Sequence, residues 1–239
     1  MKKQLILRLC ICFVVALCGM PLMAQGIFVY QKDGTKVKFP YERIDSIVAY
    51  NYGEDHEAVD LGLSVKWASC NVGAESPEEY GDYFAWGETT TKSSYSSSTS
   101  VTYGLSLSEL ESRGIIGSDG NLTAAYDAAT ANWGGSWRMP TLDEMKELLN
   151  DCTWEWTTQN GVEGHKVTGP NENSIFLPAA GYRNGTSFHG AGSYAYYWSA
   201  TLSSNGIADY LSLNHLGLDR FLGKSPQNHG FTVRPVSDK

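Results

Sequence analysis

The chain lacks several features that would each point to a class of protein. Its 239 residues contain 5 cysteines, three of them within the first 18 residues, which excludes a disulfide-dense scaffold. Beyond the first 24 residues, no apolar run approaches the roughly 20 residues that a membrane-spanning helix requires. The 5 histidines are far apart and lack metal-ligand spacing, and there is no Gly-x-Ser-x-Gly elbow of a serine hydrolase. We therefore predict a globular protein that does not span a membrane.

Positive charge is also scarce. The chain has 18 Lys and Arg against 26 Asp and Glu, a formal net charge of -8, and the basic residues are not clustered. Binding to a phosphate backbone needs clustered Lys and Arg, and an acidic surface repels it. We therefore expect no nucleic-acid partner.

The first 24 residues have the parts of a secretory signal peptide. Lys2, Lys3 and Arg8 form the basic start, an apolar run follows, and a small-residue cleavage site ends at Ala24. We expect residues 1–24 to be removed on export. A lipid anchor on Cys18 is the alternative, but the bulky Leu17 before it disfavours lipoprotein processing.

Only two cysteines remain in the chain after residue 24. Because an exported protein enters an oxidising compartment, we predict a disulfide between Cys70 and Cys152. Two separate buried thiols are the alternative, since free cysteine often behaves as a small core residue.

The clearest helix start in the chain lies after Pro140. Thr141 is predicted to be the N-cap, and Glu144, three residues later, completes a capping box. An apolar stripe then recurs at helical spacing, formed by Leu142, Met145, Leu148 and Leu149. This helix is predicted to pack on strands that follow it.

Strand and turn patterns supply the rest of the architecture. Residues 25–57 are predicted to form a β-hairpin around Asp33-Gly34 and a linker, and residues 58–239 the main domain. Alternating apolar residues predict one half-buried strand over 59–70 and a second at 82–86, whereas 87–104 is predicted to be a surface loop. Short helices are expected at 106–113 and 124–132. A hairpin around Asn160-Gly161 and strands at 174–179, 194–201, 207–214 and 230–236 complete the pattern. The fold class is α+β, with a twisted, mainly antiparallel sheet, one or two short helices and long loops.

Several ordered motifs resemble those of a known family. They are Trp137-Arg-Met-Pro-Thr-Leu-Asp-Glu144, Tyr197-Trp-Ser-Ala-Thr201 and Gly230-Phe-Thr-Val-Arg-Pro-Val236. Over residues 58 to 238 the chain resembles the Fibrobacter succinogenes major paralogous domain family of exported bacterial proteins. The resemblance implies a C-type-lectin-like fold, similar to formylglycine-generating enzymes and adhesin tips. It also implies a place in the periplasm, on the outer-membrane surface or outside the cell, but no particular reaction.

Two segments carry the candidate binding residues. The loop from 183 to 196 combines glycines with tyrosines, which give rigid amphipathic contact area. The segment from 216 to 229 connects the last strands. The predicted ligand-binding residues are Arg183, Asn184, His189, Tyr194, Tyr196, Asp219 and Arg220. A plain loop without a ligand is the alternative for the first segment.

Other conspicuous residues are predicted to be structural. We expect Arg138 to pair with an acid while its plane lies against tryptophan, and Arg234 to do the same. Most tryptophans are expected in the core rather than on a sugar-binding surface. The predicted structural set is Trp137, Arg138, Thr141, Glu144, Trp198 and Arg234.

No metal or cofactor is predicted. Calcium bound through Asn171, Glu172 and Asn173 is an alternative to their expected role as loop-capping side chains. The predicted function is a non-enzymatic module that binds a glycan or a surface protein. The alternatives are an assembly subunit whose N-terminal hairpin pairs with a strand of another chain, and an enzyme of formylglycine-generating or glycosidase type.

Overall fold

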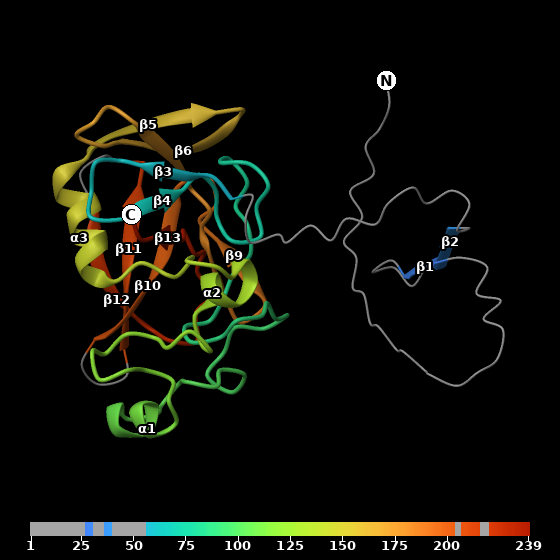
Figure 1. Cartoon of the computed structure of the whole chain (residues 1–239). Coiled ribbons are helices and arrows are strands. Elements are labelled where there is room, and N and C mark those ends of the chain that lie inside the picture. Colours follow the sequence, from blue (N-terminus) through green and yellow to red (C-terminus); the bar gives the residue numbers. More distant parts are fainter. Residues whose placement is uncertain (1–26, 31–35, 40–55, 204–206, 216–219) are drawn as a thin grey trace. The chain divides into compact units, whose positions relative to one another are not determined.

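Figure 1 shows the computed structural model of the chain, which describes residues 27–30, 36–39, 56–203, 207–215 and 220–239. Contacts divide the chain into two units, Met1–Tyr50 and Asn51–Lys239. The predicted signal peptide, the Asp33-Gly34 turn and the possible lipid-anchor site at Cys18 lie outside the described residues. In the described part, no helix is long and apolar enough to cross a membrane.

The first unit contains the predicted N-terminal hairpin. Strands β1 (Ile27–Tyr30) and β2 (Lys36–Phe39) pair antiparallel, with Ile27 opposite Phe39 and Tyr30 opposite Lys36. This confirms the strand pairing that the alternating sequence predicts.

The second unit has α+β architecture, and its sheets are small and antiparallel. The helices are α1 (Leu107–Ser112), α2 (Ala128–Trp133) and α3 (Leu142–Asp151). One sheet joins β3 (Ala58–Asp60), β4 (Lys66–Ala68) and β13 (Val236–Ser237), and another joins β5 (Thr153–Gln159), β6 (Val162–Thr168) and β7 (Ser174–Pro178). A two-stranded ribbon joins β8 (Tyr182–Asn184) and β9 (Ser187–His189). The last sheet has the order β10 (Tyr194–Ser203), β11 (Ile207–Asn214) and β12 (Phe221–Pro226).

The central helix forms as its capping box predicts. The Thr141 hydroxyl accepts from the Glu144 amide at 3.3 Å, and a Glu144 carboxylate oxygen accepts from the Thr141 amide at 2.8 Å. Met145 and Leu148 are buried, and α3 contacts β10, β11 and β12, beside which it runs in Figure 1. The helix therefore covers one face of the β10–β11–β12 sheet.

The prediction of one continuous strand over 59–70 is wrong, because this segment forms two short strands, β3 and β4. Asp60 accepts a hydrogen bond from the Gly62 amide at 2.8 Å, and Gly62 has a φ of 83°, so the chain bends after β3. It then returns as β4, antiparallel to β3. The predicted alternation of burial is nevertheless correct for Leu61, Leu63, Val65 and Trp67.

Other boundaries differ from the sequence-based prediction. The strand predicted at 82–86 is a single bridge between Phe84 and Phe231, and the one at 230–236 ends in the short β13. Helix α2 starts at Ala128 because Asp127 caps it. The segment 87–104 is irregular, yet it buries Tyr95 and Thr102. Strands β8, β9 and β12 form where connecting loops were predicted.

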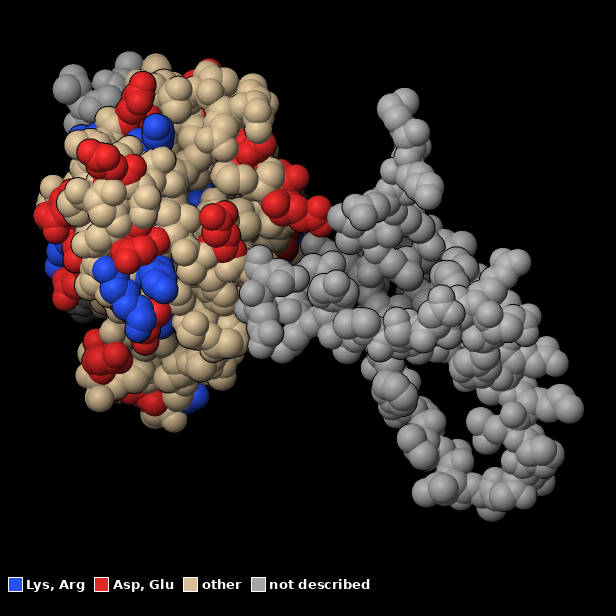
Figure 2. Space-filling model, turned by 45° about the horizontal axis from the view of Figure 1, so that its top comes forward, with Lys and Arg blue, Asp and Glu red and all other residues tan. Residues whose placement is uncertain are grey.

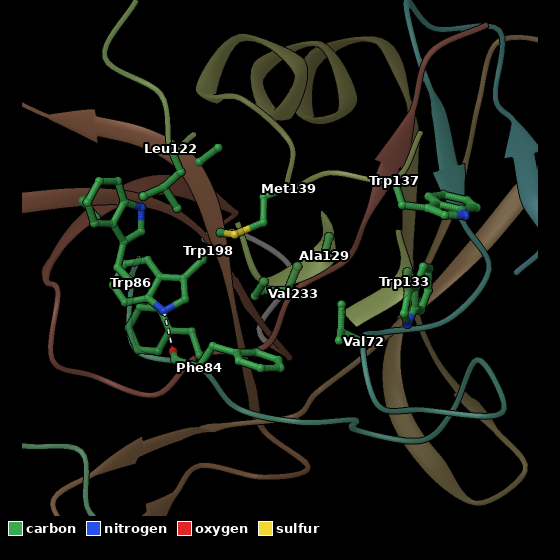
Figure 3. Packing of buried hydrophobic residues seen from close by; sticks show 14 of the residues in the cluster. Val72, Phe84, Trp86, Leu122, Ala129, Trp133, Trp137, Met139, Trp198 and Val233 are labelled. Atoms are coloured by element: carbon green, nitrogen blue, oxygen red, sulfur yellow. Dashed lines mark hydrogen bonds between the residues drawn. The ribbon is translucent and has the colours of Figure 1, made fainter. Parts of the chain in front are cut away.

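The core consists of two main clusters of buried side chains. Figure 3 shows the first, in which the Trp198 indole N–H donates to the Phe84 carbonyl at 2.9 Å. Trp86 lies in the same cluster and donates to the Ser199 carbonyl at 2.9 Å. The second cluster lies under α3 and includes Trp67, Tyr197 and Leu211. Trp67, Trp86 and Trp198 are therefore core residues, as predicted for most of the tryptophans.

The structure contradicts the predicted disulfide. Cys70 and Cys152 are both free and buried, and they belong to different core clusters. Burial raises the pKa of the Cys70 thiol, and it raises the pKa of Cys152 to about 11. Both residues are therefore small core side chains, the alternative that the sequence left open.

The two predicted structural arginines use different partners. Arg138 forms a two-pronged pair with Glu144 at 2.8 and 2.6 Å, and it also contacts Asp238 at 3.0 Å. This confirms the acidic partner. Among the described residues, the Arg138 guanidinium lies over no tryptophan ring, and Trp137 instead packs on Trp133 and on His56.

Arg234 is buried without an acidic partner among the described residues, which corrects the prediction. It donates to the Asn71 side chain at 2.8 Å and to three backbone carbonyls, those of Ala68 at 3.0 Å, Ser69 at 2.9 Å and Phe176 at 2.9 Å. Burial lowers the pKa of Arg234. Neutral oxygens thus hold the guanidinium and tie together three segments that are distant in sequence.

The environment of the Glu144 carboxylate should make the free energy of unfolding depend on pH. Burial alone would raise the pKa of Glu144, but hydrogen bonds from Arg138 and the Thr141 amide outweigh it and hold the pKa below its ordinary value of 4.5. Such a group stabilises the fold above the unfolded-state pKa, and this contribution is lost as pH falls through the folded-state value. Urea titrations should therefore show the free energy of unfolding falling more steeply below about pH 5 in the wild type than in Glu144→Gln.

The matched control is Glu111→Gln, because Glu111 is an exposed carboxylate near the end of α1. This variant should follow the wild-type pH profile. Equal pH slopes for Glu144→Gln and the wild type would contradict the assigned role.

Candidate functional site

The β10–β11–β12 sheet has one face that α3 does not cover. Side chains alternate along a strand, so Ala195 and Tyr197 of β10 point into the core under α3, whereas Tyr194 and Tyr196 point the other way. We call the uncovered set of rings and its neighbours the aromatic face. Its members are Tyr182, His189, Tyr194, Tyr196, Tyr210, Phe221 and His229.

The aromatic face rests on one buried ring, that of Phe231. The centroid of this ring lies 4.2 Å from that of Trp198, 5.2 Å from Tyr196 and 5.1 Å from Tyr210. His229 and Tyr182 follow at 5.9 and 6.1 Å. Phe231 is 3% exposed and Trp198 is fully buried, so the half-buried rings above them stand on a rigid aromatic floor.

The outer rings extend this stack toward solvent. Tyr182 stacks on His189 at 5.1 Å, and Tyr194 stacks on Tyr196 at 6.4 Å. Tyr194 is 41% exposed and Phe221 is 46% exposed. The strand register places Tyr196, Ser212 and Phe221 opposite one another, so the rings span all three strands. The exposed members of the aromatic face are His189, Tyr194 and Phe221, and the other four rings are half-buried beneath or beside them.

Two glycines allow the tyrosines to lie close to the backbone. A Cβ at Gly223 would come within 2.5 Å of the Tyr210 ring, so this ring covers β12 at the glycine. A Cβ at Gly190, which has a φ of 71°, would come within 2.9 Å of the Tyr194 ring. The absence of these two side chains sets the height of the rings above the sheet.

The aromatic face is polar at its hydroxyls but not charged there. Burial raises the pKa of Tyr196 and of Tyr210, which keeps both phenols protonated and able to donate hydrogen bonds. Burial lowers the pKa of His229, whose Nδ1 lies 2.8 Å from the Ser225 hydroxyl. Acidic side chains are scattered over the view in Figure 2, and the group of basic side chains near its middle lies among acidic neighbours.

The structure brings some of the predicted binding residues together and separates others. His189, Tyr194 and Tyr196 all belong to the aromatic face. Arg183 lies on the opposite side of the β8–β9 ribbon, and Asn184 is exposed at the end of β8. Arg220 lies over Trp154 at 5.4 Å, and Asp219 is outside the described residues.

Sequence reasoning missed four members of the aromatic face, which are Tyr182, Tyr210, Phe221 and His229. The alternation within residues 207–214 could have placed Tyr210 on the open face. No local signal marks Phe221, because β12 contains Gly223 and Pro226, residues that are typical of loops. Tyr182 and His229 join the site only through the packing of distant segments.

Two other groups of polar residues that could suggest a site are engaged within the protein. Among the described residues, no group of three or more His, Cys, Asp or Glu could hold a metal ion. The amides of Asn171 and Asn173 both donate to the Asp60 carbonyl at 2.8 Å, which gives them a loop-capping role. A hollow of about 320 Å³ beside Asp127 has that carboxylate bound to the Thr130 and Met139 amides.

Comparisons of the chain with family models, curated proteins and solved structures find no significant match in any of the three. The function is therefore inferred from the aromatic face itself.

The close approach of Tyr210 to β12 can be tested with a double-mutant cycle. Gly223→Ala should lower the free energy of unfolding by about 1–3 kcal/mol, because the added methyl group collides with the Tyr210 ring. The same change in a Tyr210→Ala background should cost far less, since the ring is gone. Equal costs in the two backgrounds, measured by urea unfolding, would contradict the described contact.

Proposed function

We propose that the protein is an exported bacterial binding module that holds a glycan on its aromatic face. The observation that carries this proposal is the array of half-buried tyrosine rings packed on buried Phe231, which the exposed Tyr194 extends toward solvent. Ring faces stack on the apolar side of pyranose rings, and a rigid array loses little entropy on binding. The tyrosine hydroxyls supply hydrogen bonds for sugar hydroxyls. No step of this function requires a cofactor or a catalytic group.

The family and its fold belong to the same proposal. We infer a C-type-lectin-like fold in the major paralogous domain family, at the bacterial surface or in the periplasm. The motifs behind the resemblance supply structural residues, such as the Arg138–Glu144 pair, buried Trp198 and buried Arg234. They support a shared scaffold, whereas the rings of the aromatic face lie mostly outside them.

A glycan array measures the proposed activity directly. The mature chain from Gln25 should bind a subset of glycans saturably, with and without calcium, and Tyr194→Ala should weaken that binding at least about tenfold. Losing a ring that the ligand covers removes on the order of 1.5–3 kcal/mol of apolar burial.

The control for this experiment is Tyr103→Ala. Tyr103 is 47% exposed but lies in the irregular 87–104 segment, so its removal should leave glycan binding unchanged. The proposal would be wrong if the folded protein bound no glycan on the array, or if Tyr194→Ala and Tyr103→Ala lost glycan binding equally.

The N-terminal hairpin supports a second candidate function, that of an assembly subunit. Strands β1 and β2 form a sheet of only two strands, and such a hairpin is marginally stable on its own in water. Pairing with a strand of another chain would extend it. The larger unit is less suited to this role at β12, since Lys224 and Pro226 are residues that protect an edge strand from pairing.

Deleting residues 26–50 separates the two candidates. The deletion should leave glycan affinity unchanged if the aromatic face is the functional surface. It should abolish incorporation into surface assemblies if the hairpin carries the function. Loss of glycan binding in a deletion variant with an unchanged melting temperature would contradict the assignment to the aromatic face.

A further inference from the structure

Arg183 lies in the angle between two aromatic rings on the other side of the β8–β9 ribbon. Its guanidinium carbon is 5.3 Å from the centre of the Tyr83 ring and 4.7 Å from that of Phe188. These two rings meet nearly edge to face, at 5.5 Å and 74°. Tyr83 is buried, whereas Phe188 is 42% exposed, so the guanidinium is held at the surface.

The backbone around Arg183 is fixed as firmly as its side chain. The amide of Arg183 donates to the Gly230 carbonyl at 2.8 Å, and the Gly230 amide donates back at 2.9 Å. Two further backbone hydrogen bonds, at 2.8 and 2.7 Å, join Gly185 to Tyr95. The end of the ribbon therefore cannot shift far, and Arg183 is pre-organised before any ligand arrives.

The donors of Arg183 are not used within the described part of the protein. By contrast, the Arg138 guanidinium donates hydrogen bonds to Glu144 and Asp238, and the Arg234 guanidinium donates to four oxygens. No described residue accepts a hydrogen bond from the Arg183 side chain or forms an ion pair with it. Arg113 and Arg220 likewise have no acidic partner among the described residues, but of the three Arg183 alone lies over two rings, and its planar fork matches a carboxylate.

We propose that Arg183 and Phe188 form a subsite for the carboxylate of an acidic sugar. The sugar ring would pack on Phe188 while its carboxylate accepts hydrogen bonds from Arg183. This inference rests on the proposed function and deepens it by naming the class of glycan. Under this proposal one end of the glycan carries a negative charge, which Arg183 recognises and the uncharged rings of the aromatic face do not.

The arrangement of the ribbon allows one ligand to reach both places. Tyr182 and His189 pair across the ribbon on the aromatic side, and Arg183 and Phe188 pair on the other side. Strand β8 is joined to Gly230, and no described strand pairs with the outer edge of β9, which is therefore the open edge of the described ribbon. A ligand that reaches both sides would pass around this edge, across a ribbon that is two strands wide.

The overall charge of the chain narrows the ligand further. A net charge of -8 repels densely charged polymers, so an isolated carboxylate on a short chain fits better than a long polyanion. Attraction to Arg183 acts at contact distance, where salt screens it least.

An otherwise neutral trisaccharide that ends in one galacturonic acid, and the same trisaccharide with that residue reduced to galactose, are suitable probes for calorimetric titration of the mature protein. The wild type should bind the acid about tenfold more tightly than the reduced form, as expected for a charge-assisted pair. Arg183→Gln should abolish this preference, and Arg183→Lys should keep only part of it because it loses the fork. Arg113→Gln, a change at an exposed arginine in α1's C-cap, should preserve the full preference.

The outcomes separate this inference from the function on which it rests. Equal wild-type affinity for the two probes, or a preference that survives in Arg183→Gln, overturns the acidic subsite and leaves the glycan-binding face standing. Failure of both probes to bind a protein shown to be folded overturns the subsite for this class of sugar. If Tyr194→Ala also leaves all glycan binding unchanged, the proposed function fails as well.

Discussion

The packing of aromatic rings on Phe231 is the contact on which the proposed site depends. The backbone of Phe231 forms a β-bridge with that of Phe84, and the Phe231 ring stacks on Trp198. The Trp198 indole in turn donates to the Phe84 carbonyl. The same buried ring supports Tyr196 and Tyr210, which carry the surface outward. The buried core and the proposed binding surface are therefore continuous, and the outer rings would need little ordering to bind a ligand.

Local chemistry made part of the fold predictable. The capping box of Thr141 and Glu144 and the hairpin at Asn160-Gly161 depend on neighbouring residues, and both form as predicted. Predictions failed where distant contacts decide. Arg234 finds neutral oxygens from two distant segments instead of an acid, and Cys70 and Cys152 lie in different clusters. Neither outcome can be read from sequence spacing.

The candidate site was predictable to a similar degree. Tyrosine and glycine content drew attention to the segment that contains His189, Tyr194 and Tyr196. It could not show that Tyr182 and Arg183, adjacent in sequence, face opposite sides of a ribbon. That division depends on strands β8 and β9, which form in a stretch that reads as loop. The two neighbours therefore have separate proposed roles, one in stacking and one in charge recognition.

The most direct test of the central claim is NMR of the mature protein with ¹³C-labelled tyrosine rings, titrated with a glycan that it binds. The account predicts saturable shifts for Tyr194, Tyr196 and Tyr210, with the Tyr103 signal unmoved. The first three rings report on the aromatic face, and Tyr103 reports on the irregular 87–104 segment. Binding that leaves the signals of the aromatic face unchanged, or that moves Tyr103 alone, would contradict the account.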